Sequence, residues 1–335
     1  MRFEKQSREI DWARELIEQS WAGRAARVVQ AANGVGIFER IGRGRATADV
    51  LAADLEIDAA MTERILIACA AMGLVARDGA GWRLTPKAEA TLLKDAPLYQ
   101  GHTIAHASQV WPVWLDLEAH LRGQGGASVF SEGAEAPARS HRDFILAMHN
   151  MAMAGRAAEL AARVDLSGAA ASGHLADVGG GPGTYAMAIC ARYPGLRATI
   201  LDLPETVEIA REVIARLGMA DRVRAVPGDW DKDEFGEAND AVLMSNVLHG
   251  PTSRAEMKLA KAHRSLKRGG RLIIQDFLMN DEKTGPLQPA LFNIMVGAFS
   301  RKELAERVAA AGFVNVRCEA MPEDLGTSLL LAAKP

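Results

Sequence analysis

The most informative segment of the chain reads Asp177-Val178-Gly179-Gly180-Gly181-Pro182-Gly183-Thr184. It begins within an apolar stretch, 174–178, that predicts a strand, and it precedes a helical pattern over 184–193. Glycines at such a junction let a ligand approach the backbone, and the following helix offers free N–H groups. A nicotinamide-type G-x-G-x-x-G pattern would need its third glycine where Thr184 stands. The D-x-G-x-G-x-G spacing therefore argues against a nicotinamide dinucleotide.

Alternating strand and helix patterns continue from this segment to the end of the chain. The further predicted strands are 198–201, 222–226, 241–246, 271–277, 313–320 and 327–333. The helices predicted between them are 205–217, 253–266 and 302–311. This alternation is typical of a doubly wound, mainly parallel sheet that binds ligands at the carboxyl ends of its strands. The expected fold class is α/β and Rossmann-like, with a mostly helical amino-terminal domain.

Two more motifs follow the ends of predicted strands. Asp202, in the run Ile200-Leu201-Asp202-Leu203-Pro204, could bind both hydroxyls of a ribose or could cap the helix that starts near Pro204. The run Pro227-Gly228-Asp229-Trp230 offers an acidic group and an apolar plane suited to an adenine ring. Together with the glycine loop, these residues predict an adenosine-type ligand.

The first part of the chain is predicted to be helical, with one hairpin. Helical patterns cover 7–32, 37–41, 47–55 and 58–74, with Asp58 as a helix cap. An alternating stretch around the turn Asp78-Gly79-Ala80-Gly81 predicts a hairpin over 74–85. Helices followed by a hairpin are the pattern of a winged helix.

A winged helix can bind DNA, but the charges of this one favour dimerisation. Residues 1–90 contain 13 Lys and Arg and 13 Asp and Glu, whereas a DNA-binding domain should have a basic face. The segment 59–73, which would enter a groove, has Glu63 and Arg64 as its only charged residues. Such a surface suits an obligate interface. We expect 1–97 to be a winged-helix-like dimerisation domain of a homodimer without nucleic acid, and a DNA-binding regulator that senses a small molecule is the disfavoured alternative.

Residues 98–169 are expected to form a helical linker that contributes to a small-molecule pocket. Helices are predicted over 98–121 and 142–164, with a loop over 123–138. His102 and His106 have metal-ligand spacing, but no Cys or carboxylate stands at ligand spacing beside them, so we predict no metal site. His149 is either a ligand-facing residue or an ordinary core residue. The candidate acceptor-binding residues are Trp111, Met148, His149, Asn293 and Met295.

The composition is that of an ordinary globular chain. The 335 residues suggest about two domains. Lys and Arg number 39 against 42 Asp and Glu, a net charge of −3 that points to neither nucleic acid nor an anionic membrane. Three cysteines without C-x-x-C spacing, a charged amino terminus and no long apolar run predict a cytoplasmic protein that does not enter the membrane.

The D-V-G-G-G-x-G loop, the D-L-P and G-D-W motifs and a V-L-H at 247–249 together resemble class I S-adenosylmethionine-dependent methyltransferases. More narrowly they resemble the branch that includes caffeate, acetylserotonin and hydroxyneurosporene O-methyltransferases. The resemblance covers nearly the whole chain, because that family also has an amino-terminal winged-helix dimerisation domain. It implies S-adenosylmethionine as cofactor and 170–335 as the methyltransferase domain.

The resemblance also implies residue roles. Gly179 and Gly181 would approach the methionine part of the cofactor, and Asp202 would bind its ribose. Asp229 and Trp230 would flank adenine. The remaining residues expected at the cofactor site are Asp177, Leu203, Gly228 and Asn246.

His249 would be the general base of the reaction, with Asp276 at the end of the next strand to orient it. An imidazole with a pKa of about 6.5 suits partial proton removal from a phenol near neutral pH. Because methyl transfer is an in-line displacement, the enzyme must also align the nucleophile.

Two departures from the family pattern leave the acceptor open. The family has H-D-W where this chain has His249-Gly250-Pro251, and the segment 293–301 is short and lacks an acidic residue. The main hypothesis is O-methylation of a small hydroxylated acceptor, aromatic or not. The alternatives are methylation of a thiol, thioether or ring carbon, which needs less proton removal, and cofactor binding with chemistry other than methyl transfer.

Overall fold

The computed structural model describes residues 7–124, 138–169 and 171–335. The chain divides into two compact units, Met1–Trp111 and Pro112–Pro335. The predicted domain limits at residues 97 and 169 stay predictions.

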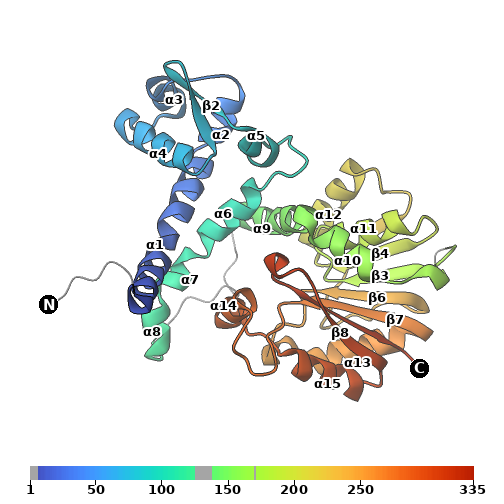
Figure 1. Ribbon diagram of the computed structural model, residues 1–335. Helices are drawn as coiled ribbons and strands as arrows, with labels where there is room; N and C mark the ends of the chain where they lie inside the picture. Colours follow the sequence, from blue (N-terminus) through green and yellow to red (C-terminus); the bar gives the residue numbers. More distant parts are fainter. Residues whose placement is uncertain (1–6, 125–137, 170) are drawn as a thin grey trace. The chain divides into compact units, whose positions relative to one another are not determined.

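The first unit packs helices around a two-stranded antiparallel sheet (Figure 1). Its helices are α1 (Arg8–Gly34), α2 (Ile37–Gly42), α3 (Ala48–Leu55), α4 (Ala59–Ala71), α5 (Pro86–Leu92) and α6 (Gly101–Gln109), and its strands are β1 (Val75–Asp78) and β2 (Gly81–Leu84). Asp58 caps α4 by accepting the N–H of Met61 at 2.7 Å. The helices predicted over 7–32, 37–41, 47–55 and 58–74, the Asp58 cap and the hairpin are confirmed, whereas α5 has no counterpart in the prediction.

The second unit is built on a seven-stranded sheet in the order β5-β4-β3-β6-β7-β9-β8 (Figure 1). The parallel strands are β3 (His174–Val178), β4 (Arg197–Asp202), β5 (Val223–Pro227), β6 (Asn239–Ser245) and β7 (Leu266–Asp276). β9 (Ser328–Ala333) runs antiparallel to β7 and to β8 (Val314–Ala320). The doubly wound, mainly parallel sheet is thereby confirmed.

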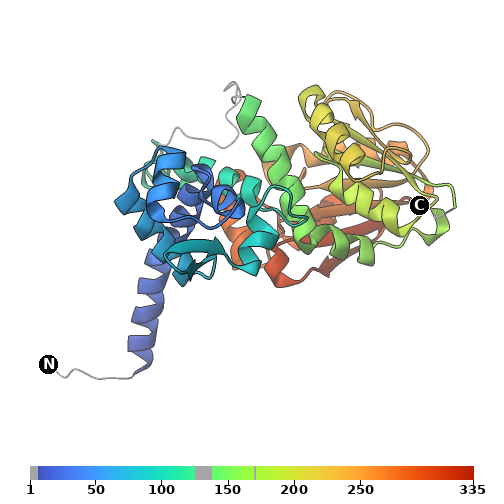
Figure 2. The same cartoon turned by 90° about the horizontal axis from the view of Figure 1, so that it is seen from above.

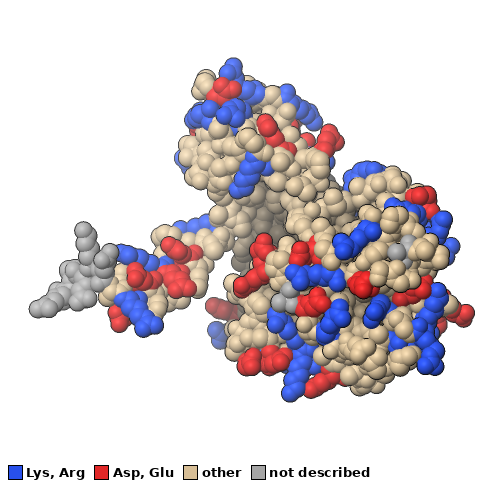
Figure 3. Space-filling model, turned by 45° about the vertical axis from the view of Figure 1, so that its right-hand side comes forward, with Lys and Arg blue, Asp and Glu red and all other residues tan. Residues whose placement is uncertain are grey.

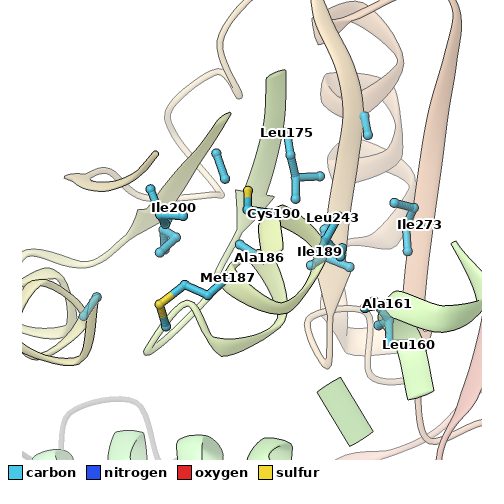
Figure 4. Packing of buried hydrophobic residues seen from close by; sticks show 14 of the residues in the cluster. Leu160, Ala161, Leu175, Ala186, Met187, Ile189, Cys190, Ile200, Leu243 and Ile273 are labelled. Carbon is cyan, nitrogen blue, oxygen red and sulfur yellow. The ribbon is translucent and has the colours of Figure 1, made fainter. Parts of the chain in front are cut away.

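Helices cover both faces of this sheet, as Figures 1 and 2 show. One face is covered by α10 (Ala157–Arg163), α11 (Thr184–Arg192) and α12 (Pro204–Arg216), and the other by α13 (Ala255–Ser265) and α15 (Arg301–Ala310). Leu175, Leu243 and Ile273 face the first layer, where they pack with residues such as Leu160 and Ile189 (Figure 4). Successive strand residues point to opposite faces. Both faces are therefore apolar, and polar groups gather at the strand ends.

Three further stretches of helix differ from the prediction. The segment predicted as one helix over 98–121 breaks into α6, α7 (Trp111–Leu115) and α8 (Leu117–Leu121), near Pro112, whose ring disfavours the helical conformation in the preceding residue. The helix predicted over 142–164 is α9 (Ala138–Met151) followed by a π turn, Ala152–Arg156, before α10. The helix α14 (Leu287–Val296) has no counterpart in the prediction.

The surfaces agree with the small net charge. On the face shown in Figure 3, acidic and basic side chains are interspersed over the second unit. Most of the predicted loop 123–138 lies outside the described residues. Among the residues described, no helix is both long and apolar enough to cross a membrane.

Candidate functional site

The glycine loop turns tightly from β3 into α11. Gly179, Gly181 and Gly183 have φ angles of +64°, +55° and +76°, a region that favours glycine. A Cβ at Gly179 would lie 2.2 Å from the ring of Trp230, and one at Gly183 would lie 2.1 Å from Ile200. At Gly181, by contrast, no atom of the described residues lies within 4 Å of that position. The loop is closed on its protein side and leaves open space at Gly181.

Asp202, at the end of β4, binds the backbone of the glycine loop. Its Oδ2 accepts the N–H of Gly181 at 2.8 Å, and its Oδ1 accepts the N–H of Leu203 at 2.8 Å. Burial raises the pKa of Asp202, and these two hydrogen bonds oppose the rise. The N-cap of α12 is Leu203, which makes no side-chain cap bond. The alternative in which Asp202 caps this helix is therefore not what the structure shows.

Asp177 lies behind the loop. It is 1% exposed, and neither of its carboxylate oxygens accepts a hydrogen bond of normal geometry from the described residues. A Cβ at Gly180 would come within 2.5 Å of the carboxyl carbon, so the loop can pass over Asp177 because residue 180 is glycine. Burial, together with the nearby Asp202 carboxylate, raises the pKa of Asp177 to about 8.

The loop after β5 carries Gly228, Asp229 and Trp230. The N–H of Gly228 donates to the backbone oxygen of Asp202 at 2.9 Å, which places this loop beside the end of β4. Asp229 accepts the N–H of Asp231 at 2.9 Å and pairs with Lys232 at 2.7 Å, and the hydrogen bond from Lys232 lowers the pKa of Asp229.

Two buried lysines of α13 support Trp230 and were not predicted. The Nζ of Lys258 lies 4.5 Å from the ring centroid of Trp230, and the Nζ of Lys261 donates to the carbonyl of Trp230 at 3.0 Å. Both lysines are about 95% buried. The sequence gives a weak signal for them: they are spaced three apart, on the face of an amphipathic helix that also carries apolar residues.

The end of β6 contributes Asn246. Its φ is +56°, which asparagine tolerates better than most residues, and its N–H donates to the carbonyl of Gln275 at 2.8 Å. Its Oδ1 is buried and accepts no hydrogen bond from the described residues. A buried acceptor without a donor is unfavourable, so this oxygen is available to a ligand.

His249 and Asp276 are in hydrogen-bond contact, as expected from the family resemblance. The Nδ1 of His249 lies 2.9 Å from Oδ1 of Asp276, which is 2% exposed. Asp276 also accepts the N–H of Phe277 at 2.8 Å and that of Leu248 at 3.2 Å. The ring of Phe292 meets the imidazole edge-on, with centroids 4.9 Å apart. The imidazole is therefore fixed on one nitrogen by a carboxylate that is itself held in place.

The residue after the histidine has to be glycine. Gly250 has φ +54° and ψ −170°, and a Cβ there would lie 3.0 Å from the carbonyl carbon of Gly297. This conformation is essentially restricted to glycine. Gly250, which stands where the family has an aspartate, thus lies against the backbone of the short segment 293–301.

The predicted acceptor residues occupy different places. His149 is buried, and its Nδ1 lies 2.8 Å from the hydroxyl of Thr184 at the start of α11. Met148 and Met295 are half-buried, and Asn293 is exposed, with its Oδ1 accepting the N–H of Ala298 at 2.9 Å. Trp111 ends the first unit, where its indole N–H donates to Gln30 at 2.5 Å.

The described residues thus bring together, at the carboxyl ends of the parallel strands, most of the predicted cofactor and catalytic residues, namely Gly179, Gly181, Asp202, Leu203, Gly228, Asp229, Trp230, Asn246, His249 and Asp276. No group of three metal-ligating side chains occurs among the residues described. These cofactor and catalytic residues lie at the end of the sheet where open α/β sheets bind their ligands.

The chain belongs to the O-methyltransferase family. The O-methyltransferase domain matches residues 118–314, and the O-methyltransferase dimerisation domain matches residues 21–94. The family is dependent on S-adenosylmethionine.

Similar proteins support this assignment. The chain is 31% identical to the N,N-dimethyltransferase OxyT of Streptomyces rimosus, over 96% of this chain and 97% of that protein. It is also 31% identical to the 3-hydroxy-5-methyl-1-naphthoate 3-O-methyltransferase of Streptomyces sahachiroi, over 86% of this chain and 85% of that protein. Human N-acetylserotonin methyltransferase, solved in complex with S-adenosylmethionine, has the same fold, with a TM-score of 0.83 at 20% identity and 99% of each chain covered.

The buried carboxyl of Asp177 predicts a pH dependence of stability. In the folded protein it stays protonated up to about pH 8, whereas an unfolded Asp ionises near pH 4. The folded state therefore binds more protons across this window, and the free energy of unfolding falls as the pH rises from about 4 to 8. Asp177→Asn should show a smaller fall than the wild type. Urea unfolding at pH 5 and pH 8 measures this change in the free energy of unfolding for both proteins.

The exposed Asp221 provides the matched control, because its side chain is 73% exposed. Asp221→Asn should keep the wild-type dependence on pH. Equal dependence in the wild type and Asp177→Asn would show that Asp177 is not protonated in the folded state.

Proposed function

We propose that the protein transfers a methyl group from S-adenosylmethionine to a hydroxyl of a small aromatic acceptor, with His249 as general base. The observation that carries the proposal is the contact between His249 and Asp276 at 2.9 Å, at the sheet edge that also bears the glycine loop. The names of curated relatives support an aromatic acceptor, since one acts on a naphthoate and others on acetylserotonin.

The residues of the sheet edge fit the cofactor. Gly181 leaves open space above its backbone, and the Oδ1 of Asn246 is a buried acceptor in need of a donor. We assign Gly179 and Gly181 to the methionine part, Asp202 to the ribose, and Asp229 and Trp230 to the adenine. The bound cofactor supplies an activated methyl group on a sulfonium centre.

The hydrogen bonds of His249 define its role. A carboxylate only accepts hydrogen bonds, so Nδ1 of His249 carries the proton that points at Asp276, and Nε2 is left with a lone pair. That nitrogen can take a proton from an acceptor hydroxyl as the oxygen becomes nucleophilic. Asp276 fixes the ring orientation and stabilises the imidazolium that results.

The acceptor atom has rivals. Curated relatives include an N,N-dimethyltransferase and an L-tyrosine C(3)-methyltransferase, so nitrogen and carbon are candidates besides oxygen and sulfur. A phenol hydroxyl must lose its proton to become a good nucleophile, so its methylation depends more on a base than that of a thioether or an activated carbon. Dependence on His249 therefore separates a hydroxyl acceptor from a thioether or an activated carbon. If no homocysteine product forms in any assay, chemistry other than methyl transfer is favoured.

We also propose that the first unit pairs two copies of the chain, since it contains the dimerisation domain. Four large apolar residues of α1, namely Trp12, Leu16, Ile17 and Trp21, are 48% to 66% exposed in the single chain. Large apolar side chains exposed on one helix are candidates for contact with a second chain.

Leu16→Lys combined with Trp21→Lys should convert a dimer into a monomer, because two buried cations without partners oppose association. Sedimentation equilibrium of the full chain measures the mass. Glu18→Lys on the same helix adds positive charge without removing an apolar side chain and should stay dimeric. A monomeric wild type would refute the homodimer.

Asp202→Ala should weaken the binding of S-adenosylhomocysteine by about 100-fold, since it removes hydrogen bonds to a charged group and loosens the glycine loop. Isothermal titration calorimetry measures the affinity. Asp221→Ala, an exposed site next to β5, serves as control. Affinity equal to the wild type in Asp202→Ala would remove the assigned role.

His249→Ala should lower kcat for a phenolic acceptor by about 100-fold or more, the contribution typical of a general base, and leave cofactor affinity unchanged. Asp276→Asn should lower kcat by a smaller factor, because the base remains but its orientation is lost. Single-turnover assays with radiolabelled cofactor measure both. Unchanged turnover in His249→Ala would eliminate this histidine as the base.

A further inference from the structure

Arg156 lies beside the catalytic pair but has no assigned role. It ends the π turn Ala152–Arg156, between α9 and α10. Its guanidinium carbon lies 5.6 Å from the ring centroid of Phe277, the residue that directly follows Asp276. Single π turns inside helices occur frequently at functional sites. This placement directs a cation toward the end of β7.

The charge of Arg156 is not neutralised by the described part of the chain. The side chain is half-buried. Its Nη1 lies 4.0 Å from the sulfur of Met151, and the guanidinium also interacts with the neutral hydroxyl of Tyr185. Within residues 7–124, 138–169 and 171–335, no carboxylate lies within ion-pair distance of Arg156. About two turns onward, Arg163 pairs with Glu159 at 2.5 Å. A partly buried cation without a counter-ion favours an anionic ligand.

An aromatic row connects Arg156 to the base. Phe277 stacks on Phe292 with a centroid distance of 4.0 Å and an interplanar angle of 24°. Phe292 in turn meets the imidazole of His249 at 4.9 Å. The order along the row is cation, two phenyl rings and base. Aromatic side chains placed in this way offer apolar surface against which a planar ring can pack.

The backbone holds Arg156 in this position. Gly155 has φ +108°, and a Cβ there would lie 3.7 Å from Leu325. The Nη2 of Arg156 lies 3.8 Å from where a Cβ of Gly326 would be. The turn therefore packs against the segment that leads into β9, on the β7 side of the sheet and away from the end of β4, where Asp202 lies.

Neighbouring polar groups complete the environment. The hydroxyl of Tyr185 accepts a hydrogen bond from Gln275 at 3.0 Å. Burial raises the pKa of Tyr185, and the positive charge of Arg156 is among the effects that oppose this rise. Arg156 thus lies close enough to interact with the hydroxyl of Tyr185, which also interacts with Ser245.

We propose that Arg156 binds a carboxylate of the acceptor, whose ring lies against Phe277 and Phe292 and whose hydroxyl reaches His249. The substrate class is therefore a hydroxylated aromatic acid. The planar guanidinium matches a carboxylate through two parallel hydrogen bonds. The inference rests on the proposed function only at its His249 end. The amino acid part of the cofactor also has a carboxylate, so the experiment separates the two sources.

The probes are two acids, 3-hydroxybenzoate and 6-hydroxy-2-naphthoate, and their neutral amides. Calorimetry measures their binding to the full chain saturated with S-adenosylhomocysteine. The wild type should bind at least one acid about tenfold more tightly than its amide, as one charge-assisted interaction provides. Arg156→Gln should remove this preference, and Arg156→Lys should retain part of it. Arg163→Gln, about two turns away on α10, should behave as the wild type.

A second titration compares S-adenosylhomocysteine with 5′-methylthioadenosine, which lacks the carboxylate. Arg156→Gln should bind both with wild-type affinity. Weaker binding of S-adenosylhomocysteine alone would assign Arg156 to the cofactor and overturn the proposal. Equal affinity of the wild type for acid and amide, or binding of neither acid, would also overturn it. If the wild type fails to bind S-adenosylhomocysteine, the proposed function itself fails.

Discussion

The hydrogen bond of 2.8 Å from the N–H of Gly181 to Asp202 joins the two loops on which the rest of the site depends. A second bond of 2.8 Å, from the N–H of Gly179 to the carbonyl of Leu201, fixes the same junction. Because Gly179 is held there without a side chain, the ring of Trp230 can lie against its backbone. The backbone of the glycine loop thus positions the loops that follow β4 and β5. A larger residue at position 179 would displace the ring of Trp230.

The third loop depends equally on α13. Acidic residues crowd it, namely Asp229, Asp231, Asp233 and Glu234, and they would repel one another without cations. Burial lowers the pKa of Lys258, and Asp231, 3.9 Å away, opposes that effect. Lys261 donates to two carbonyls of the loop, at 3.0 and 2.9 Å. A buried ammonium is tolerated where hydrogen bonds and acidic groups surround it, so loop and helix stabilise each other.

Local chemistry made much of this structure predictable. The glycine loop and the hairpin over β1 and β2 follow from residue types at fixed offsets along the chain, which act over a few residues. The contact of His249 with Asp276 was expected from the resemblance to O-methyltransferases. The helix break near Pro112 also had a local signal. The π turn at Arg156 and the buried lysines of α13 had almost none, because their conformations depend on partners distant in sequence. Arg156, for example, is defined by Phe277 and by the backbone near Gly326.

The two departures from the family's sequence pattern lie against each other in the structure. Gly297 and Gly250 approach so closely that a side chain at 250 would meet backbone, and an aspartate next to the histidine is therefore excluded. The base does not need it for orientation. Asp276 reaches His249 from the neighbouring strand, and the N–H groups of Leu248 and Phe277 hold its two oxygens. Since this carboxylate is 2% exposed and anchored to backbone, it restrains the imidazole more firmly than a flexible neighbour in a loop could.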